Sequence, residues 1–289
     1  MSPSTSKSCL VTGGTAGIGF VTARELVRGG ASVTIVGRDV ARGEAAVAAI
    51  KATTGSNAID FVAADLSDQS QLRIFARAFR ERRPKLDVLV NNVGAMFGRR
   101  RLTADGIEMT FALNHLSYFL LSELLLPCRL AAAPSRIINV ASEAHRGATL
   151  DFDDLQGEMR YDRWLAYKRS KLANLMFTYE LSRRLAGRGV TVNALHPGFV
   201  ATDIGVRHAF VPRLLWSVGK LAAVSPEKGA ATSIYLASAP EIAEVSGQYF
   251  IDCRPARSSA ASHDREAAQR LWDVSANLTN TVYESPPMV

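Results

Sequence analysis

The sequence predicts a doubly wound α/β fold, in which helices cover both faces of a parallel β-sheet. Short β-branched runs alternate with longer amphipathic runs along the 289 residues. This alternation requires parallel strands joined by right-handed helical crossovers. No Gly/Ser linker, internal repeat or low-complexity tract interrupts it. We therefore expect one domain over residues 1–289, a three-layer α/β/α sandwich of the Rossmann type.

The expected elements follow from the spacing of apolar residues, which differs between strands and helices. In chain order they are the strand Cys9–Val11, helix Gly17–Arg28, strand Ser32–Val36, helix Val40–Thr53, strand Ile59–Ala63, helix Gln69–Arg82, strand Val88–Asn91, helix Thr103–Leu130, strand Arg136–Ala141, helix Leu165–Ala186 and strand Thr191–Leu195. After His196 the pattern is irregular until Ser225-Pro226-Glu227, which predicts a helix start. A strand is expected at Gln248–Asp252. A last helix, at about His263–Ala276, lies in a C-terminal extension over residues 253–289.

The charge of the chain does not indicate a nucleic-acid partner. The net charge is +7 and the pI is near 9.5, but basic residues are spread among acidic ones and no nucleic-acid-binding module accompanies them. The densest basic clusters are Arg80–Arg83 and Arg99–Arg101. We interpret both as solvated surface, and a smaller role in steering an anionic cofactor or substrate stays open.

No targeting or membrane-spanning segment is expected. The first strand begins at Cys9, which leaves no room for a signal peptide in residues 1–8. The apolar passage Phe119–Leu126 is interrupted by Ser122 and Glu123, far short of the ~20 residues that span a bilayer. We therefore expect a cytoplasmic protein.

The three cysteines and five histidines are spread along the chain. Cys9, Cys128 and Cys253 fit neither a disulfide framework nor a zinc site, so we expect reduced thiols with structural roles. His145 beside Glu143 lacks the spacing of metal ligands. We expect His145 to be structural or to line a substrate site, and we expect no bound metal.

A glycine-rich loop, Thr12–Gly19, joins the first strand to the first helix. Gly13, Gly17 and Gly19 permit a tight turn, close backbone approach to a pyrophosphate and close packing of helix on strand. The helix N-terminus adds unpaired N–H groups and a positive dipole. A glycine motif alone is often only a turn, but the strand, loop and helix context favours dinucleotide binding.

The second strand ends at Val36-Gly37-Arg38-Asp39, where a dinucleotide-binding fold reads the ribose. Gly37 cannot supply the carboxylate that holds the 2′-hydroxyl of NAD(H), whereas the Arg38 guanidinium suits the 2′-phosphate of NADP(H). Arg42, one helical turn on, could reinforce Arg38. We favour NADP(H) over NAD(H). The alternative is that both arginines are surface residues and that Asp39, expected to cap the next helix, reads the ribose.

Tyr167 and Lys171 lie one turn apart on one face of an expected helix. A tyrosine, whose reference pKa is ~10, is a poor base near neutrality, but an adjacent ammonium favours the phenolate and lowers that pKa. A tyrosine and a lysine at this spacing are weak evidence alone, because both residue types are common on helix faces. The significance of this pair comes from Ser142, at the end of the strand Arg136–Ala141, and from the glycine loop. Together they predict acid-base chemistry at Tyr167.

These features resemble the short-chain dehydrogenase/reductase family over nearly the whole chain. The motifs that carry the resemblance are the glycine loop, Asn91-Asn92-Val93-Gly94, Asn114, Ser142, Tyr167 with Lys171, and His196-Pro197-Gly198. Residues 113–121, 140–145 and 225–252 resemble the retinol-dehydrogenase-like branch, which is itself similar to light-dependent protochlorophyllide reductase.

The resemblance implies a role for each matching residue. Tyr167 would be the general acid in carbonyl reduction and the base in alcohol oxidation, and Ser142 would hydrogen-bond the reacting oxygen. Lys171 would bind the nicotinamide ribose. Asn114 would hold a water that links Lys171 to solvent, or else make only local helix bonds. Asp65 would meet the adenine, or else cap the next helix. The implied cofactor-binding residues are Gly13, Thr15, Ala16, Gly17, Ile18, Gly19, Arg38, Asp65, Leu66, Asn91, Gly94, Tyr167, Lys171, Pro197, Gly198, Val200 and Thr202.

Two features depart from the usual family pattern. Val93 stands where the family usually has alanine, a small packing change near the cofactor. The segment between Ser142 and Tyr167 is longer than in the shortest members because of an acid-rich stretch, residues 147–163. The retinol-dehydrogenase-like branch also carries a long segment there.

The resemblance implies hydride transfer between NADP(H) and an apolar ketone, aldehyde or alcohol. Reduction is favoured because NADP(H) pools usually drive that direction. Residues 205–225 fall where the family places a substrate lid, and its apolar members are Phe210, Leu214, Leu215 and Trp216. The alternatives are a dinucleotide-sensing or scaffold protein without turnover, and a double-bond reductase of a tetrapyrrole-like substrate. Related enzymes often pair through the helices that hold Asn114 and Tyr167, so a homo-oligomer stays open.

Overall fold

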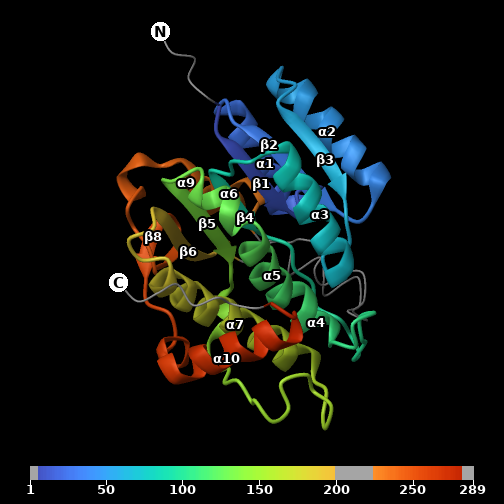
Figure 1. The fold of residues 1–289 in the computed structure, drawn as a ribbon, viewed down its shortest axis with the longest axis vertical. Helices are drawn as coiled ribbons and strands as arrows, with labels where there is room; N and C mark the ends of the chain where they lie inside the picture. Colours follow the sequence, from blue (N-terminus) through green and yellow to red (C-terminus); the bar gives the residue numbers. More distant parts are fainter. Residues whose placement is uncertain (1–5, 199–223, 282–289) are drawn as a thin grey trace.

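The computed structural model describes residues 6–198 and 224–281. Their central feature is one eight-stranded sheet with the strand order β3-β2-β1-β4-β5-β6-β7-β8 (Figure 1). Neighbouring strands pair in parallel except β7 and β8, which are antiparallel. The predicted doubly wound α/β fold is confirmed, with one antiparallel strand added at an edge.

The elements have the following bounds. The strands are β1 (Ser8–Thr12), β2 (Ser32–Gly37), β3 (Ile59–Ala63), β4 (Val88–Asn91), β5 (Ser135–Val140), β6 (Val190–His196), β7 (Tyr249–Ile251) and β8 (Arg254–Ala256). The α-helices are α1 (Gly17–Arg28), α2 (Val40–Thr54), α3 (Gln69–Arg82), α4 (Met109–Phe111), α5 (Ser117–Leu124), α6 (Leu126–Leu130), α7 (Arg163–Arg184), α9 (Pro226–Ser238) and α10 (Arg265–Leu278). A π-helical turn, η1 (Ala112–Leu116), and three 3-10 turns, η2 (Glu143–His145), η3 (Pro240–Ile242) and η4 (Ala260–His263), complete the set.

Helices cover both faces of the sheet because its strands are apolar on both sides. On one face Val11 and Val90 pack with residues of α1, α2 and α9. On the other face Leu10 and Leu89 pack with residues of α3, α5 and α7. Adjacent strand residues thus serve opposite layers, as the two-residue period of a strand requires.

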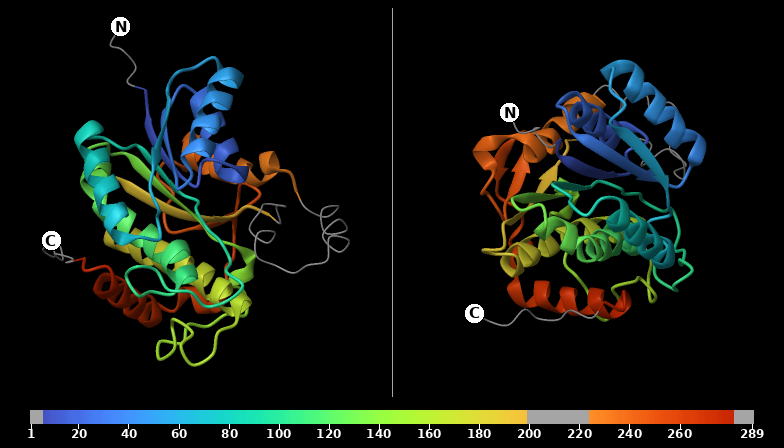
Figure 2. Two further views of the ribbon diagram at one scale, coloured as in Figure 1. Left: turned by 90° about the vertical axis from the view of Figure 1, so that its right-hand side faces the viewer. Right: turned by 45° about the horizontal axis from the view of Figure 1, so that its top comes forward.

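Helix α10 forms a further layer outside α7 (Figure 2). Its Trp272 is buried between two helices, with ring centroids 4.9 Å from Phe119 of α5 and 6.0 Å from Phe177 of α7. The Arg184 guanidinium lies 4.0 Å from the centre of the Trp272 ring. The C-terminal extension therefore contributes to the core as well as to the surface.

The predicted helix Thr103–Leu130 is wrong at its start and in its continuity. Residues 103–107 form a turn in which Thr103 N donates to Ile107 O over 2.8 Å. The helix begins at Met109 because the buried Glu108 carboxylate accepts hydrogen bonds from Thr110 N (2.9 Å) and Phe111 N (2.8 Å). It then passes through η1 before α5 and α6.

Strand β8 was not predicted from the sequence. Its residues, Arg254-Pro255-Ala256, include none with a strong strand preference. The tight turn from β7 places Asp252 and Cys253 at φ 47° and 61°, which returns the chain antiparallel along the edge of the sheet. Proline is tolerated in β8 because an edge strand leaves some N–H positions unpaired.

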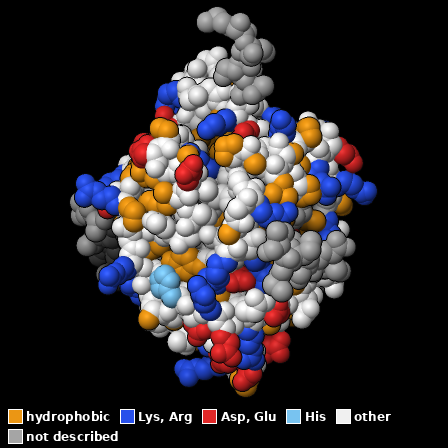
Figure 3. Space-filling model, turned by 60° about the vertical axis from the view of Figure 1, so that its left-hand side comes forward, with side chains coloured by type: hydrophobic (Ala, Val, Ile, Leu, Met, Phe, Trp, Pro, Cys, Tyr) orange, Lys and Arg blue, Asp and Glu red, His pale blue; other side chains and the backbone are white. Residues whose placement is uncertain are grey.

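The structure also bears on the expectations about membrane spans, metal ligands, cysteines and surface charge. Within residues 6–198 and 224–281, no helix combines the length and apolar character needed to cross a bilayer. In the same residues no group of three or more His, Cys, Asp or Glu side chains could hold a metal ion. Cys9, Cys128 and Cys253 are free thiols. On the face in Figure 3, Lys and Arg side chains lie in separate groups among acidic ones.

Candidate active site

The loops that follow six parallel strands meet at the carboxyl end of the sheet. These are the loops after β1, β2, β3, β4, β5 and β6. The strand order reverses between β1 and β4, which in this class of fold opens a crevice for a ligand at the carboxyl ends of the strands. The predicted site residues in the described part of the chain come from these loops and from the helices α1, η1 and α7.

The glycine loop leaves no room for side chains at its closest contacts. Gly13 and Gly17 adopt φ 65° and 56°. A Cβ on Gly19 would lie 2.4 Å from Gly13 O and 2.5 Å from Asn92 Nδ2. Ala16 precedes α1 without a side-chain cap, so the first N–H groups of α1, from Gly17 onward, remain available to an anionic ligand. The loop therefore fits a dinucleotide pyrophosphate.

Asn92 braces this loop, a role that the sequence did not predict. Its Nδ2 donates to Thr12 O over 2.8 Å. The Thr12 hydroxyl in turn accepts from Asn92 N (2.8 Å) and Val93 N (3.1 Å). These bonds join the loops after β1 and β4 across the point where the strand order reverses. The signal available in the sequence was the Asn91-Asn92 pair directly after a buried strand.

Arg38 presents a guanidinium at the end of β2. Its side chain is 62% exposed, and its Nη1 lies 3.5 Å from Asp65 Oδ2 at the end of β3. Asp39 caps α2 as expected, with its Oδ1 accepting from Arg42 N over 3.1 Å. The Arg42 side chain turns back toward Asp39, with 3.6 Å between Nε and Oδ2. Of these two arginines, Arg38 has the more exposed side chain, 62% against 47% for Arg42.

Gly37 and Thr15 connect the ribose end of the site to the glycine loop. A Cβ on Gly37 would lie 3.0 Å from Thr15 Cγ2. The loops after β1 and β2 are thus in contact, as one dinucleotide reaching across both would require. Ala16 and Ile18 lie in the same turn at the start of α1.

Asp65 does not cap the next helix. Asp68 does so, accepting from Gln71 N over 3.1 Å. Asp65 Oδ1 instead accepts from Ser67 N (2.9 Å) and Ser67 Oγ (2.6 Å), which fixes the carboxylate at the end of β3 near Arg38. The neighbouring Leu66 is buried in the core.

Asn91 directs its side chain into the sheet interior. It is fully buried, and its Nδ2 donates to Asn139 Oδ1 (2.9 Å) on β5 and Ser122 Oγ (3.2 Å) on α5. Any contact between Asn91 and a cofactor would therefore come from its backbone. The alternation of side chains along a strand turns the Asn91 side chain away from the crevice.

Ser142 and Tyr167 are brought together, as predicted. Ser142 follows β5 and caps η2, its Oγ accepting from Ala144 N over 3.1 Å. Tyr167 lies in the second turn of α7, whose cap Asp162 accepts from Leu165 N over 2.7 Å. Burial raises the pKa of Tyr167, and its hydrogen bond with Ser142 opposes that rise without cancelling it. The expected lowering of the tyrosine pKa is therefore not found, because desolvation is the larger effect.

Lys171 is buried beside Tyr167. Its Nζ donates to Val140 O over 2.9 Å and lies 5.7 Å from the centre of the Tyr167 ring. A Cβ on Gly94 would come within 3.4 Å of that Nζ. Burial lowers the pKa of Lys171 to about 8. The loop after β4 therefore lies directly against the Lys171 ammonium.

Asn114 links three parts of the site and does not make only local helix bonds. Its Oδ1 accepts from Ala95 N (2.8 Å), and its Nδ2 donates to Ala95 O (2.9 Å) and Ser170 Oγ (3.0 Å). It lies in η1, where Ser117 N donates to Ala112 O as a π-helix requires. π-helical turns often occur at functional sites, and this one directs Asn114 toward the loop after β4 and toward α7.

The remaining predicted residues fall into two groups. Pro197 and Gly198 follow β6, and Gly198 adopts φ 81°. The others lie outside the described residues: Val200, Thr202, Phe210, Leu214, Leu215 and Trp216.

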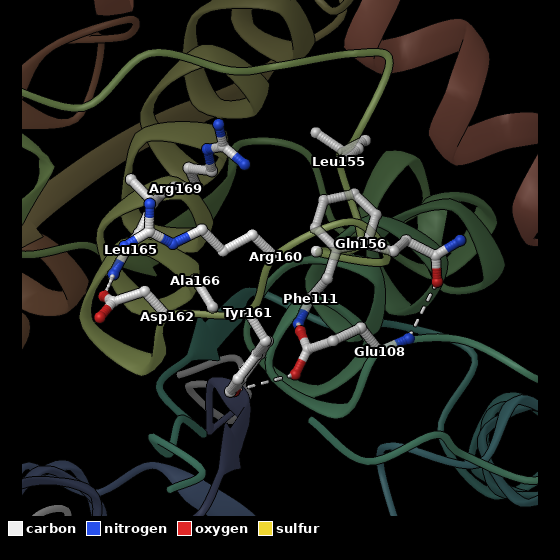
Figure 4. Close-up of a pocket in the computed structure, with 11 residues that line it drawn as sticks. Glu108, Phe111, Leu155, Gln156, Arg160, Tyr161, Asp162, Leu165, Ala166 and Arg169 are labelled. Carbon is white, nitrogen blue, oxygen red and sulfur yellow. Dashed lines mark hydrogen bonds between the residues drawn. The ribbon is translucent and has the colours of Figure 1, made fainter. Parts of the chain in front are cut away.

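The acid-rich stretch 147–163 folds over α4, next to the site. Figure 4 shows Tyr161 and Gln156 both directed at Glu108: Tyr161 Oη lies 3.3 Å from its Oε1, and Glu108 N donates to Gln156 Oε1 over 2.9 Å. Asp154 accepts from Glu158 N over 2.5 Å, which closes the stretch on itself. The cavity between these residues measures about 20 Å³, room for one water at most. The stretch 147–163 therefore packs closely against α4 and leaves no cavity large enough for a second ligand.

Comparisons with known proteins agree with this arrangement. The family model described as short chain dehydrogenase matches residues 7–209. The chain is 44% identical to Retinol dehydrogenase 11 of Homo sapiens over 272 residues, which cover 94% of this chain and 85% of that protein. It is 42% identical to Retinol dehydrogenase 12 of Mus musculus over 278 residues, 96% and 88% of the two chains.

Solved structures show the same likeness. An uncharacterized protein from Mycobacterium Paratuberculosis superposes with a TM-score of 0.77 at 34% identity, over 97% of this chain and 95% of that one. The RhlG/NADP active-site complex of Pseudomonas aeruginosa gives a TM-score of 0.68 at 29% identity, over 86% and 97%.

The fold and the site together define an oxidoreductase that binds a nicotinamide dinucleotide, and the chain belongs to the short-chain dehydrogenase family. Within that family it lies in the retinol-dehydrogenase-like branch.

Proposed function

We propose that this chain is an NADP(H)-dependent oxidoreductase that transfers a hydride between the nicotinamide and an apolar ketone, aldehyde or alcohol, with Tyr167 as acid and base. The observation that carries the proposal is the meeting of Ser142, Tyr167 and Lys171 at the edge of the sheet where the glycine loop lies. The similar retinol dehydrogenases are named for an apolar alcohol, which supports the substrate class.

The protein's own residues supply the proton and the charge stabilisation. In carbonyl reduction the Tyr167 hydroxyl donates its proton to the substrate oxygen, and the Ser142 hydroxyl donates a hydrogen bond to the same oxygen. The Lys171 ammonium, 5.7 Å from the Tyr167 ring centre, stabilises the phenolate that remains. Asn114, bonded to Ala95 and Ser170, holds the loop after β4 beside Lys171. NADP(H), when bound, supplies or takes up the hydride.

The preference for NADP(H) rests on Gly37 and Arg38. Gly37 offers no carboxylate to a ribose 2′-hydroxyl, and the Arg38 side chain is 62% exposed at that end of the site. Two similar structures hold NADP, the RhlG complex and a short-chain dehydrogenase from Burkholderia cenocepacia J2315. We propose reduction as the main direction and the cytoplasm as the location.

The deciding experiment measures NADPH consumption with a panel of apolar ketones and aldehydes beside small polar carbonyl compounds. We expect turnover with the apolar members. Tyr167→Phe should lower kcat by about 10²–10⁴-fold, the usual contribution of a placed proton donor, while the dissociation constant for NADPH stays within about twofold.

Tyr235→Phe is the matched control, since Tyr235 lies on α9, which covers the opposite face of the sheet from α7. It should keep the turnover of the unchanged protein. A Tyr167→Phe variant that retains activity within about tenfold would contradict the assignment of Tyr167. NADPH binding without turnover on any carbonyl compound would instead favour a dinucleotide-sensing protein.

A further inference from the structure

Two histidines hold opposite ends of one peptide group at the candidate active site. The carbonyl oxygen of Ser142 lies 2.6 Å from His145 Nδ1. The N–H of Glu143, which belongs to the same peptide group, donates to His196 Nδ1 over 3.3 Å. His145 belongs to η2 and His196 ends β6. The backbone that carries the Ser142 hydroxyl is therefore fixed between two imidazoles.

The partners of each ring determine its tautomer. A carbonyl oxygen only accepts, so His145 Nδ1 must carry the hydrogen that it donates to Ser142 O. His145 Nε2 accepts from Ser259 N over 3.0 Å, so that nitrogen must be bare. His196 Nδ1 accepts from Glu143 N and must also be bare, which leaves the hydrogen on its Nε2. The two rings are thus neutral and of opposite tautomers.

The surroundings hold the His145 ring in place and keep both rings uncharged. The fully buried His145 ring meets Tyr249 of β7 edge-on, with 5.5 Å between centroids. Tyr249 Oη donates to Glu143 Oε1 over 2.8 Å, and Arg146 Nε donates to Glu143 Oε2 over 2.7 Å. The charged groups that face His145 are Glu143 and Arg146, and those that face His196 are Glu143 and Asp252. Burial lowers the pKa of both histidines despite the nearby carboxylates.

We propose that His145 and His196 are positioning residues that hold the Ser142–Glu143 peptide group and so aim the Ser142 hydroxyl at the reacting oxygen. Through the N–H of Ser259, His145 also connects this peptide group to the C-terminal extension. The inference rests on the proposed function, because it assigns Ser142 its role in hydride transfer. The two residues act on the reaction only through Ser142. They need not touch the substrate.

The proposal predicts a separation of kcat from binding. His145→Phe keeps a ring against Tyr249 and removes the side-chain hydrogen bonds to Ser142 O and from Ser259 N. Only the backbone N–H of residue 145 still donates to Ser142 O, over 3.1 Å. Because small displacements of a catalytic group are costly, kcat should fall by about tenfold or more, while KM and the NADPH dissociation constant stay within about threefold. His145→Asn puts an N–H donor back at the Nδ1 position, and kcat should recover to within about threefold.

His263→Phe is the matched control for loss of a histidine ring near this extension. The His263 ring stacks on Tyr179 and lies 2.9 Å from Ser258 Oγ, without contact to the Ser142–Glu143 peptide. Its kcat should equal that of the unchanged protein. If His145→Phe keeps kcat within about twofold while Ser142→Ala abolishes turnover, the positioning role is refuted although the proposed function stands.

The tautomers give a test that does not depend on turnover. With five histidines in the chain, ¹⁵N imidazole spectra can be assigned by removing one ring at a time, with His145→Asn and His196→Asn. At neutral pH we expect a hydrogen on Nδ1 of His145 and on Nε2 of His196. We also expect both rings to stay neutral at pH values at which an exposed histidine is already charged. A charged ring at neutral pH, or the reverse tautomer in either residue, overturns the inference even if no substrate is ever found.

Discussion

At the scale of single residues, Lys171 shows how burial and charge oppose each other in the site. Its ammonium donates to Val140 O over 2.9 Å and is closed in by η1, α7 and the loop after β4. Desolvation disfavours the charged form, which lowers the pKa of Lys171 to about 8. The residue therefore changes charge close to the working pH, whereas Tyr167, whose pKa is raised by burial, remains protonated there.

The first prediction concerns the pH dependence of carbonyl reduction. Lys171 is charged below its pKa and neutral above it, so kcat should fall as pH rises through about 8. Tyr167 keeps its proton over this range and does not cause the fall. Initial rates at saturating NADPH, measured across this range, show the effect. Lys171→Arg remains charged and should lack the alkaline fall even if its kcat is lower. An unchanged alkaline fall in that variant would mean that another group titrates.

The second prediction concerns the choice of cofactor. Arg38→Asp removes a charge-assisted hydrogen bond worth roughly 1.5–3 kcal/mol, so NADPH should bind about 10- to 150-fold more weakly. The new carboxylate can accept the ribose hydroxyl of NADH, so NADH should bind more tightly. Dissociation constants of both cofactors, obtained by titration, decide the matter.

Arg82→Asp changes the net charge equally and serves as the control. Arg82 ends α3, at the opposite edge of the sheet from the site. It should leave the cofactor preference unchanged. Equal binding of NADH and NADPH by the unchanged protein would instead make Asp39 the ribose-reading residue.

At the scale of elements, helix α1 shows what a local pattern can determine. Its bounds, Gly17–Arg28, agree with those predicted from the sequence, because a glycine loop, an apolar helical period and a glycine pair all mark them. The helix Thr103–Leu130 was predicted less well. The Glu108 cap and the π-helical turn η1 depend on tertiary contacts with Tyr161, Ala95 and Ser170, which lie far away in the sequence.

The third prediction tests the N-terminus of α1. In Gly19→Ala the new Cβ would lie 2.4 Å from Gly13 O, a distance that real contacts do not reach, so the glycine loop must shift. NADPH affinity should fall by more than about tenfold, because the loop loses its fit to the pyrophosphate. Gly29→Ala, at the other end of α1, is the control. Gly29 has φ −75°, and a Cβ added there would meet no atom closer than 3.4 Å. This variant should bind NADPH normally. Normal binding by both variants would show that the loop does not hold the cofactor.

At the scale of the whole molecule, buried histidines make stability depend on pH. His115 in η1 is fully buried, its Nε2 lies 2.9 Å from Ser275 Oγ of α10, and burial lowers its pKa from 6.5 to about 4. Since the folded state disfavours the charged ring, its contribution is complete above pH 6.5 and is lost as pH falls toward 4. His145 and His196 act in the same direction.

The fourth prediction follows from the lowered pKa of His115 in the folded state. Between pH 7 and pH 5 the free energy of unfolding should fall by about 2 kcal/mol on account of His115 alone. His115→Gln, which does not titrate, should show a correspondingly smaller fall in urea denaturation at the two pH values. His263→Gln is the control at an exposed position and should keep the full fall. The same pH dependence in all three proteins would exclude His115 as a source.

How far the sequence could predict this molecule depends on the range of the interactions. The fold, the glycine loop and the meeting of Ser142 with Tyr167 follow from local patterns and from the order of parallel strands. The positions of Asn91 and Asn92 could not be assigned, because adjacent residues of one motif point to opposite sides of the chain. The contacts of His145 with Ser259 required residues more than a hundred positions apart to meet.

Because α10 packs against α7, the catalytic helix is covered only after a later part of the chain has been synthesised. Tyr167 and Lys171 lie on α7, and its Phe177 packs against Trp272 of α10. During translation α7 leaves the ribosome long before α10 has been made, so Phe177 and its neighbour Phe119 stay uncovered in the growing chain. Exposed apolar surface of this kind invites chaperones and aggregation. The helix that carries the catalytic pair is therefore covered only when α10, which is made later, has docked on it.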